Sequence, residues 1–288
     1  MHQSQENGEI SEDSRKREAV SLAVSIVLYQ PCQSALDRTI DSLGLALDRA
    51  RATGLRRVEV ILIDHSPQPR GDIVTAIGWS QAEDDIRLHY EHVGANPGFG
   101  AGHNRAFDVC RSWADIFLVA NPDLEFAPDS LAEGLAFLVK QPGVGLVAPA
   151  LIGQGETIRP SCFRYPDIVT LLARFLGGPW ATSRSWRYEC RDWDAGQMAF
   201  NPPLISGCCM LFRAATFARL GGFDSRYFLY FEDFDLSLRA GRQGLSAYLP
   251  TMRIRHAGGN AVRKGIRHHW YFVQSAWRFF RSHGFAWK

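Results

Sequence analysis

Residues 20–29 read VSLAVSIVLY, a short run that is apolar on both faces, rich in β-branched residues and stopped by Pro31. Such a run is typical of a buried parallel strand. The residues that follow carry Leu36, Ile40, Leu43 and Leu47 at helical spacing, and a glycine at position 54 provides a helix stop. The opening of the chain therefore predicts a strand followed by a helix.

The same alternation continues along the first half of the chain. Buried strands are predicted at residues 58–64, 86–93 and 115–123, with a helix at 104–113. Units of about 30 residues in which strands alternate with helices predict a right-handed, doubly wound parallel sheet. Ligands bind such sheets beyond the carboxyl ends of the strands. The polar residues expected at these ends are Tyr29, Asp64, Asn96 and Asp123.

The second half of the chain is less regular. It predicts a helix at 129–139, strands at 144–148 and 207–213, and an amphipathic helix at 232–244. We expect the polar, aromatic stretch 159–196 to form the second half of a cleft. Residues 1–18 are polar and mixed in charge, which is typical of a disordered lead-in.

The composition of the 288 residues is that of an ordinary globular protein, with 46% hydrophobic and 22% charged residues. Six cysteines without C-x-x-C spacing indicate neither a zinc ribbon nor a disulfide framework, and they fit a reducing cytoplasm. The sequence contains no apolar run long enough for a spanning helix or a signal peptide. We therefore expect a cytoplasmic chain that is neither secreted nor inserted.

Charge is segregated along the chain. Residues 251–288 hold eight Lys/Arg and no Asp/Glu, so residues 1–250 carry a net −6 although the whole chain carries +2. The basic segment places four apolar side chains at roughly helical spacing with three arginines nearby: Trp270, Val273, Trp277 and Phe280, with Arg267, Arg278 and Arg281. Two interpretations stay open. The segment is a terminal helix docked on the domain, an interfacial helix on an anionic membrane, or both, since the two interpretations are compatible.

The stretch PGFGAGHN at residues 97–104 follows a strand and precedes a helix. It does not match the G-x-G-x-x-G dinucleotide fingerprint because His103 takes the third glycine's place, which disfavours a nicotinamide enzyme. Its glycines allow backbone to approach a ligand closely, and a flexible turn explains them equally well.

Three polar groups carry candidate chemistry, each beside a simpler interpretation. Asp123 ends a strand where it could bind a hard divalent cation, or it belongs to an Asx turn. The acids at 232, 233 and 235 either complement a helix dipole or, desolvated among aromatic residues, supply a general base with a raised pKa. His256 precedes Ala-Gly-Gly and could reach a metal, although a lone histidine is more often structural.

Seven motifs occur together and in order: VSIVLY, VILIDHS, NPGFGAGHN, VANPDLEF, SGCCMLFR, LGGFDSRYFLYFEDFDLSLRAGRQG and IRHAGG. From about Val24 to the C-terminus, this ordered set resembles the inverting family 2 glycosyltransferases of the GT-A fold, in particular their rhamnosyltransferase-like branch. The resemblance implies a Rossmann-like, mostly parallel α/β sheet with helices on both faces and an acceptor-side subregion. The expected domain spans 19–255, with a nucleotide-sugar half at about 19–125 and an acceptor half at about 126–255, before a basic aromatic helical segment at 256–288.

The resemblance also implies roles for particular residues. Asp233 matches the catalytic base, with Glu232 beside it, whereas Asp123 and His256 match the residues that contact Mg²⁺ or Mn²⁺. The family usually reads D-N-x-S where this chain has Asp64-His65-Ser66. The residues expected to bind the nucleotide-sugar are Tyr29, Asp64, Asn96, Gly98, Phe99, Gly102, Asn104 and Asn121. The position of Arg263 and Lys264 just past the glycines suggests that they close over the same phosphates, although a solvated basic loop explains them equally well. The residues expected to contact the acceptor are Trp180, Trp186 and Asp235, although the aromatic residues of this stretch equally suit a local core.

The activity that the resemblance implies is a single inverting displacement. Rhamnose from TDP-rhamnose is transferred to a hydroxyl of a lipid-linked saccharide in O-antigen or related lipopolysaccharide synthesis. Its expected place is peripheral on the inner face of the cytoplasmic membrane, with no nucleic-acid partner. A UDP-hexose donor on the same fold, a metal-dependent hydrolase and a catalytically silent saccharide-binding scaffold are the alternatives.

Overall fold

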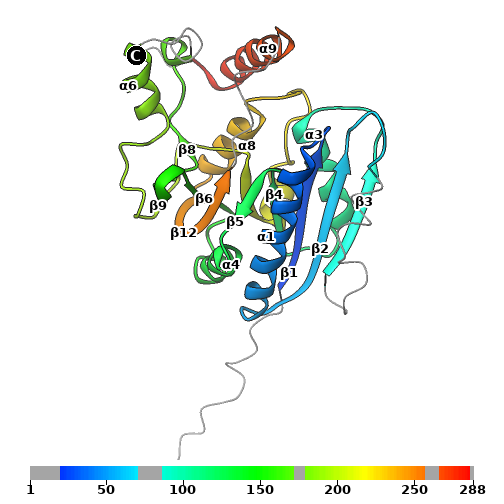
Figure 1. Ribbon diagram of the computed structural model, residues 1–288. Coiled ribbons are helices and arrows are strands. Elements are labelled where there is room, and N and C mark those ends of the chain that lie inside the picture. The colour runs from blue at the N-terminus through cyan, green and yellow to red at the C-terminus, as the bar shows by residue number, and fades with distance from the viewer. Residues whose placement is uncertain (1–19, 71–85, 172–178, 257–265, 286–288) are drawn as a thin grey trace, which may run out of the picture.

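The computed structural model describes residues 20–70, 86–171, 179–256 and 266–285 (Figure 1). The helices and strands of the first half are β1 (Val20–Leu28), α1 (Gln33–Arg51), β2 (Leu55–Asp64), β3 (Ile86–His92), α3 (Phe99–Cys110), β4 (Ile116–Ala120), β5 (Leu124–Phe126), α4 (Ser130–Lys140) and β6 (Leu146–Ile152). Those of the second half are the 3₁₀ turn η2 (Gln154–Glu156), β7 (Ile158–Pro160), β8 (Cys162–Phe163), α6 (Pro179–Tyr188), β9 (Ala199–Phe200), β10 (Leu204–Ile205), β11 (Cys209–Arg213), α7 (Ala214–Arg219), α8 (Glu232–Gly241), β12 (Ser246–His256) and α9 (Ile266–His283).

The predicted strands of the first half are confirmed, and they are parallel. The main sheet has the order β3-β2-β1-β4-β11-β6-β12-β5, so the chain moves outward from β1 to β3 and then returns to β4 on the other side of β1. In the register of these strands Leu28 lies opposite Asp64, and Asp64 lies opposite His92. The carboxyl ends of β1, β2 and β3 therefore meet at one edge, beside the point where strand order reverses.

The second half departs from a purely parallel sheet. Strand β11 runs antiparallel between β4 and β6, while β6 and β12 are parallel to each other. The apolar run of β11 predicted a buried strand correctly, but an apolar run carries no information about strand direction. The sheet is mostly parallel, with this antiparallel strand near its centre and the short antiparallel strands β5, β7 and β9 paired with β6 and β12.

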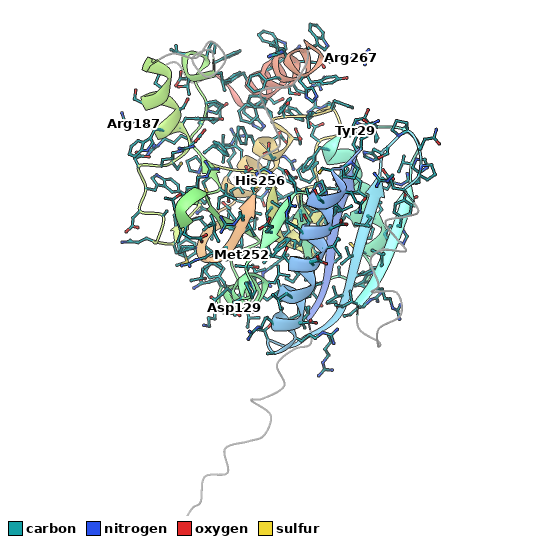
Figure 2. All side chains as sticks on the ribbon, viewed as in Figure 1. Tyr29, Asp129, Arg187, Met252, His256 and Arg267 are labelled. Carbon is teal, nitrogen blue, oxygen red and sulfur yellow. The ribbon has the colours of Figure 1, made fainter. Side chains whose placement is uncertain are left out.

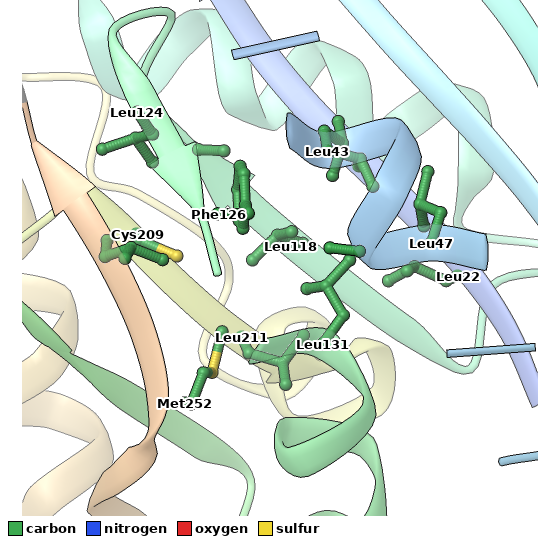
Figure 3. Packing of buried hydrophobic residues seen from close by; sticks show 14 of the residues in the cluster. Leu22, Leu43, Leu47, Leu118, Leu124, Phe126, Leu131, Cys209, Leu211 and Met252 are labelled. Atoms are coloured by element: carbon green, nitrogen blue, oxygen red, sulfur yellow. The ribbon is translucent and has the colours of Figure 1, made fainter. Parts of the chain in front are cut away.

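Helices cover both faces of the sheet. On the face that carries α1 and α4, Leu43 and Leu47 of α1 and Leu131 of α4 pack with Leu22 and Leu118 of the sheet (Figure 3). On the opposite face, α3, α7 and α8 contribute a second buried cluster that includes Phe107, Phe217 and Leu236. Each fully buried side chain of this size contributes about 1.5–3 kcal/mol relative to an exposed one. The two clusters hold the sheet edge rigidly.

A third cluster docks α9 onto the domain. Phe279 and Phe280 of α9 are buried with Tyr227, Phe231 and Leu204. The docked terminal helix is therefore confirmed, with one face of α9 buried. Within the described residues, no helix is both long and apolar enough to cross a lipid bilayer. The lead-in predicted for residues 1–18 lies outside the described residues.

Two predicted boundaries need correction. Helix α3 begins at Phe99, inside the glycine-rich stretch, rather than at residue 104. The glycine loop is therefore the first turn of a helix rather than a free connection. The strand predicted at 144–148 begins at Leu146 and extends to Ile152.

Candidate active site

A first cavity of about 710 Å³ lies against the carboxyl edge of β1, β2 and β3. The sheet side of its wall comes from Val27, Tyr29, His65, Asn96, Gly98 and Phe99, and the other side comes from Phe228, Leu229 and three α9 residues, Arg267, His268 and Tyr271. Four predicted nucleotide-sugar residues, at 29, 96, 98 and 99, are thus brought together. The α9 residues were not predicted, because nothing local in the sequence shows that the last helix folds back over the first strand.

Gly98 fixes the glycine loop against a distant segment. Its φ is +108°, and a Cβ at this position would collide with the backbone of Phe228. The adjacent Phe99 N–H donates to the Phe228 carbonyl at 3.0 Å, and the Gly98 N–H donates to Asn96 Oδ1 at 3.0 Å. Asn96 therefore shapes the loop, and glycine is required at 98 for both the backbone angle and the close approach.

We expect Gly98→Ala to lower the melting temperature and to weaken nucleotide binding at least about tenfold, because the strained backbone and the clash displace one wall of the first cavity. Gly143→Ala is the matched control, since a Cβ there meets nothing within 4 Å. Thermal unfolding and nucleotide titration of both variants measure the difference. Equal behaviour of the two variants would contradict this role of Gly98.

Asp64 lies beneath the edge rather than in the first cavity, and its carboxylate is fully occupied. Its Oδ1 accepts from the Ser66 N–H at 2.8 Å, and its Oδ2 accepts from the Tyr90 hydroxyl at 2.7 Å. Burial raises the pKa of Asp64, but these hydrogen bonds outweigh burial and hold the pKa below its ordinary value. Asp64 thus stays ionised and positions Ser66, which helps to line a smaller hollow of about 230 Å³ with Gln30 and Arg70.

His65 is a residue of the first cavity to which the sequence assigned no role. Its side chain is 2% exposed, and among the described residues its Nε2 has no hydrogen-bond partner. Burial lowers the pKa of His65, so the ring is neutral at pH 7. Gly102 leaves room for this ring, because a Cβ there would press on Val27 and His65. In the sequence, the sign that this position is unusual was that His65 stands where the family motif D-N-x-S has asparagine.

Asn104 was predicted to bind the nucleotide-sugar, but in the structure its side chain bonds to the protein backbone. Its Nδ2 donates to the Phe223 carbonyl at 2.8 Å, and its Oδ1 accepts from the Phe223 N–H at 2.9 Å. Both ends of the amide are therefore used to clip α3 to the segment before α8. Asn104 supports the loop and does not line either large cavity.

A second cavity of about 420 Å³ adjoins the first, and Phe99 and Leu229 line both. Its polar lining comes from Asn121, Ser206, Glu232, Asp233 and His256. Its remaining wall is mostly aromatic and apolar, and it includes Phe163, Leu171, Tyr188, Tyr230 and Phe272. This combination of a polar end and an apolar wall suits an amphiphilic ligand.

Asp123 and His256 meet through strand pairing. His256 ends β12 and lies opposite Leu124 of β5, which places its Nε2 at 3.2 Å from Asp123 Oδ1. Burial raises the pKa of Asp123, but the hydrogen bond and charge of His256 lower it below its ordinary value, so the carboxylate is ionised. Figure 2 shows His256 near the centre of the molecule, between the level of Tyr29 and that of Met252.

One carboxylate and one imidazole are too few to hold Mg²⁺ or Mn²⁺ alone. No cluster of three or more His, Cys, Asp or Glu side chains occurs in the described parts of the chain. Mg²⁺ usually takes one or two carboxylates and completes its shell with substrate phosphates and water. The Asp123–His256 pair fits a cation that is held jointly with a diphosphate.

Asp233 lies in the first turn of α8 and faces the second cavity. Its Oδ2 accepts from the Gly207 N–H at 2.7 Å, and its Oδ1 accepts from the Phe234 N–H at 2.9 Å. Burial raises the pKa of Asp233 to about 6 despite these two hydrogen bonds. The carboxylate is therefore mostly ionised at pH 7 and basic enough to accept a proton. Gly207, which lies in SGCCMLFR, is a functional position that the sequence did not single out.

Glu232 differs from Asp233 although the two are adjacent. Its side chain is buried, and its Oε2 has no hydrogen-bond partner among the described residues. Burial and the neighbouring Asp233 charge raise the pKa of Glu232 well above its ordinary value, which favours its protonated form. The two residues, predicted as catalytic together, therefore lie in different environments: Asp233 has two backbone hydrogen bonds, whereas Glu232 Oε2 has none in the described residues.

The backbone before α8 is strained. Tyr230 and Phe231 have φ values of +71° and +66°, a conformation that costs bulky residues about 1–3 kcal/mol each. The buried Phe231 ring in the third cluster holds this conformation. Such strain is often stored at functional sites, and here it sets the direction in which α8 presents Asp233.

The prediction that Asp235 contacts an acceptor is wrong in this structure. Asp235 Oδ2 accepts from Arg239 at 2.9 Å, and Oδ1 lies 2.7 Å from His283 Nε2. The carboxylate is buried, and it joins α8 to α9. Asp235 lies on the inner side of its helix and has a structural role.

The remaining predicted residues lie at the margin of the described structure. Trp186 is 48% exposed on α6, the helix whose Tyr188 lines the second cavity. The side chain of Trp180 and the residues Arg263 and Lys264 lie outside the described residues. Cys208 and Cys209 are buried, free thiols, and Cys208 also lines the second cavity.

Comparisons with known proteins give two kinds of likeness. No family model matches the chain. The chain is 31% identical over 245 residues to the N-acetylglucosaminyl-diphospho-decaprenol L-rhamnosyltransferase of Mycobacterium tuberculosis (strain ATCC 25618 / H37Rv). The aligned region covers 82% of this chain and 75% of that protein. It is 25% identical over 153 residues to the O-antigen biosynthesis protein RfbC of Myxococcus xanthus, over 50% of this chain and 11% of that one.

Two solved structures share the fold. One is the mannosyltransferase PcManGT of Pyrobaculum calidifontis in complex with GDP-Man and Mn²⁺, with a TM-score of 0.59, 19% identity, and coverage of 91% of this chain and 63% of that one. The other is GalNAc-T7 with UDP, GalNAc and Mn²⁺, with a TM-score of 0.62, 16% identity, and coverage of 92% and 48%.

Proposed function

The chain belongs to the rhamnosyltransferase-like glycosyltransferases of the GT-A fold, and from this premise we propose that it transfers L-rhamnose from TDP-rhamnose to a hydroxyl of a lipid-linked saccharide. The observation that carries the proposal is the joint placement of an ionised base, Asp233, and of His256 in one cavity beside the glycine loop, with Asp123 next to His256 at 3.2 Å. The relatives named for rhamnosyl transfer and O-antigen synthesis support the sugar and the lipid-linked acceptor.

The nucleotide-sugar is proposed to occupy the first cavity. Tyr29, Phe99, Phe228 and Tyr271 offer aromatic surfaces for the base, and no acidic side chain lines this cavity in the described residues. Arg267 adds a positive charge from α9. These features favour an anionic ligand with an aromatic base, which is the chemistry of a nucleoside diphosphate.

The diphosphate is proposed to reach the boundary between the two cavities, near Asn121 and Asp123. A divalent cation held there by Asp123 and His256 would neutralise the negative charge that develops on the leaving diphosphate. The Mn²⁺ complexes of the two structural relatives support a divalent cation.

Asp233 is proposed to act as the general base. The acceptor hydroxyl donates its proton to Asp233 as its oxygen forms a bond to the anomeric carbon, and the bond to the nucleoside diphosphate breaks on the opposite face. A single displacement of this kind inverts the anomeric configuration. Burial raises the pKa of Asp233 only to about 6, so the base is mostly ionised and available at pH 7.

Nucleotide binding is expected to depend on the base and on the metal. TDP with Mn²⁺ at about 100 times its Kd should add about 2.7 kcal/mol of stability, which corresponds to several degrees at roughly 2–4 °C per kcal/mol. A thermal-shift panel of TDP, UDP, GDP and NAD, each with and without Mn²⁺, measures this. Asp123→Asn should abolish the Mn²⁺-dependent part of the shift.

Asp129→Asn is the control for this experiment, because Asp129 is exposed at the start of α4 and its side chain makes no capping hydrogen bond. Figure 2 shows it far from His256, at the opposite end of the molecule from Arg267. A thermal shift with UDP in place of TDP would indicate a UDP-sugar donor and leave the proposed mechanism unchanged. No shift with any nucleotide would favour the silent scaffold.

We also propose that the protein works at the inner surface of the cytoplasmic membrane, as a peripheral protein. A lipid-linked acceptor is anchored in a bilayer, so the enzyme must approach that surface. The basic, acid-free terminal segment supports an anionic membrane.

A further inference from the structure

Helices α6 and α9 share properties that set them apart from the rest of the surface. Neither contains an acidic residue, and each displays exposed tryptophan and arginine. On α9, Trp270 and Trp277 are 65% and 60% exposed, and on α6, Trp186 is 48% exposed. Large aromatic side chains left in water at this level, beside cations, are typical of a surface that meets a partner.

The exposed side chains of α9 lie on one face of the helix. Trp270, Val273 and Trp277 follow the i, i+3, i+7 spacing, and the exposed Arg281 lies one turn further along the same face. Phe279 is buried on the opposite face, and the buried Phe280 lies at the border between the two faces. The outer apolar stripe is therefore not needed for the core, and it is rimmed by positive charge.

Both helices contribute to the wall of the second cavity. Tyr188 of α6 and Phe272 of α9 both line it. Figure 1 shows α6 and α9 at the end of the molecule away from α4, and Figure 2 shows Arg187 and Arg267 on this end, above the level of His256. The second cavity therefore extends from the candidate catalytic groups to the two helices that carry the exposed tryptophans.

We propose that the exposed faces of α6 and α9 together form a docking surface for an anionic lipid bilayer, and that the lipid of the acceptor passes between them into the second cavity. Tryptophan prefers the headgroup region and arginine pairs with lipid phosphates, so the chemistry of both helices matches one occupant. The aromatic wall at Phe163, Tyr188 and Phe272 then contacts the proximal lipid while the saccharide meets Asp233. This second part rests on the proposed function.

Sedimentation with vesicles of phosphatidylcholine alone, or of phosphatidylcholine and phosphatidylglycerol in equal parts, tests the docking surface. We expect the full chain to pellet with the anionic vesicles only. The Trp270→Ala/Trp277→Ala variant should lower partitioning at least about tenfold. Arg187→Gln and Arg281→Gln should each lower it about fivefold, and added salt should do the same.

Two variants control for general effects of removing aromatic or cationic side chains. Phe200→Ala removes an exposed aromatic side chain from β9, and Arg111→Gln removes an exposed arginine after α3. Both should pellet as the wild type does, and all variants should keep their melting temperatures and nucleotide affinities. Equal pelleting of the tryptophan variant and the wild type, or of neutral and anionic vesicles, would overturn the docking surface.

A transfer assay with two acceptors separates this inference from the proposed function. The tryptophan variant should lose transfer to a long-chain lipid-linked acceptor in vesicles and retain transfer to a short-chain, water-dispersed analogue. Equal activity on both acceptors would overturn the entry route. Wild-type protein that pellets with anionic vesicles but transfers sugar to neither acceptor would overturn the proposed function and leave the docking surface standing.

Discussion

Asp233→Asn is expected to lower kcat by about 10²–10⁴-fold, the usual contribution of a general base. The amide has nearly the same shape, and its oxygen can still accept one of the two hydrogen bonds from Gly207 and Phe234. It cannot take a proton from the acceptor hydroxyl. Steady-state transfer of rhamnose from TDP-rhamnose measures kcat, and calorimetry measures nucleotide affinity, which should change little.

Glu232→Gln is the matched control for this prediction. Burial and the Asp233 charge raise the pKa of Glu232 well above its ordinary value and so favour its neutral form, which an amide resembles. Glu232→Gln should therefore alter kcat far less than Asp233→Asn does. A larger loss of kcat in Glu232→Gln than in Asp233→Asn would show that Asp233 is not the base. Full activity of Asp233→Asn would remove the proposed mechanism.

The pH profile provides a second test of the same base. Burial raises the pKa of Asp233 to about 6, and the base must be ionised to act, so kcat/KM should fall as pH decreases through about 6. The free energy of unfolding depends on the ionisation of Asp233 in the opposite direction to kcat/KM. A carboxyl group with a raised pKa stabilises the fold only when protonated, so this contribution is lost as pH rises from about 4 to about 6.

Asp235→Ala is expected to destabilise the fold by about 3–5 kcal/mol, because it leaves Arg239 and His283 without their shared carboxylate in a buried site. At roughly 2–4 °C per kcal/mol, the melting temperature should fall by at least about 6 °C. Chemical denaturation measures the free energy of unfolding. The variant should also loosen α9, since His283 connects that helix to α8.

Glu125→Ala is the comparison for Asp235→Ala. Glu125 pairs with Arg38 at 3.0 Å, but their side chains are 38% and 51% exposed, so the pair should contribute less than about 1 kcal/mol. An Asp235→Ala variant as stable as Glu125→Ala would contradict the structural role. If Asp235→Ala instead raised the KM for the acceptor and left stability unchanged, the predicted contact between Asp235 and the acceptor would be supported.

Several features of this protein follow from the sequence alone. The apolar, β-branched runs predict β1, β2, β3 and β4 because strands buried on both faces tolerate few polar residues. Polar residues that end such runs must lie at one edge of a parallel sheet, so Tyr29, Asn96 and Gly98 were found as neighbours. The ordered motifs also pointed to Asp233, which we propose as the base, and to Asp123 and His256, which the structure brings together.

Other features depend on contacts between segments that are distant in sequence. Asp123 and His256 meet because β12 pairs antiparallel with β5, and strand direction is not encoded in an apolar run. His268 and Tyr271 line the first cavity only because α9 folds back over the sheet edge.

The acids of α8 show the same limit within a single helix turn. Asp233 and Asp235 are two residues apart, which rotates them by about 200° around the helix axis. They must therefore face opposite directions, and the sequence determines this much. Which of them faces the cavity was decided by the aromatic cluster and by Arg239 and His283, which hold the inner side of α8 against the rest of the fold. Sequence thus determined the local elements and the chemical groups, whereas tertiary packing selected which of those groups face the site, because the direction of a side chain depends on what its helix packs against.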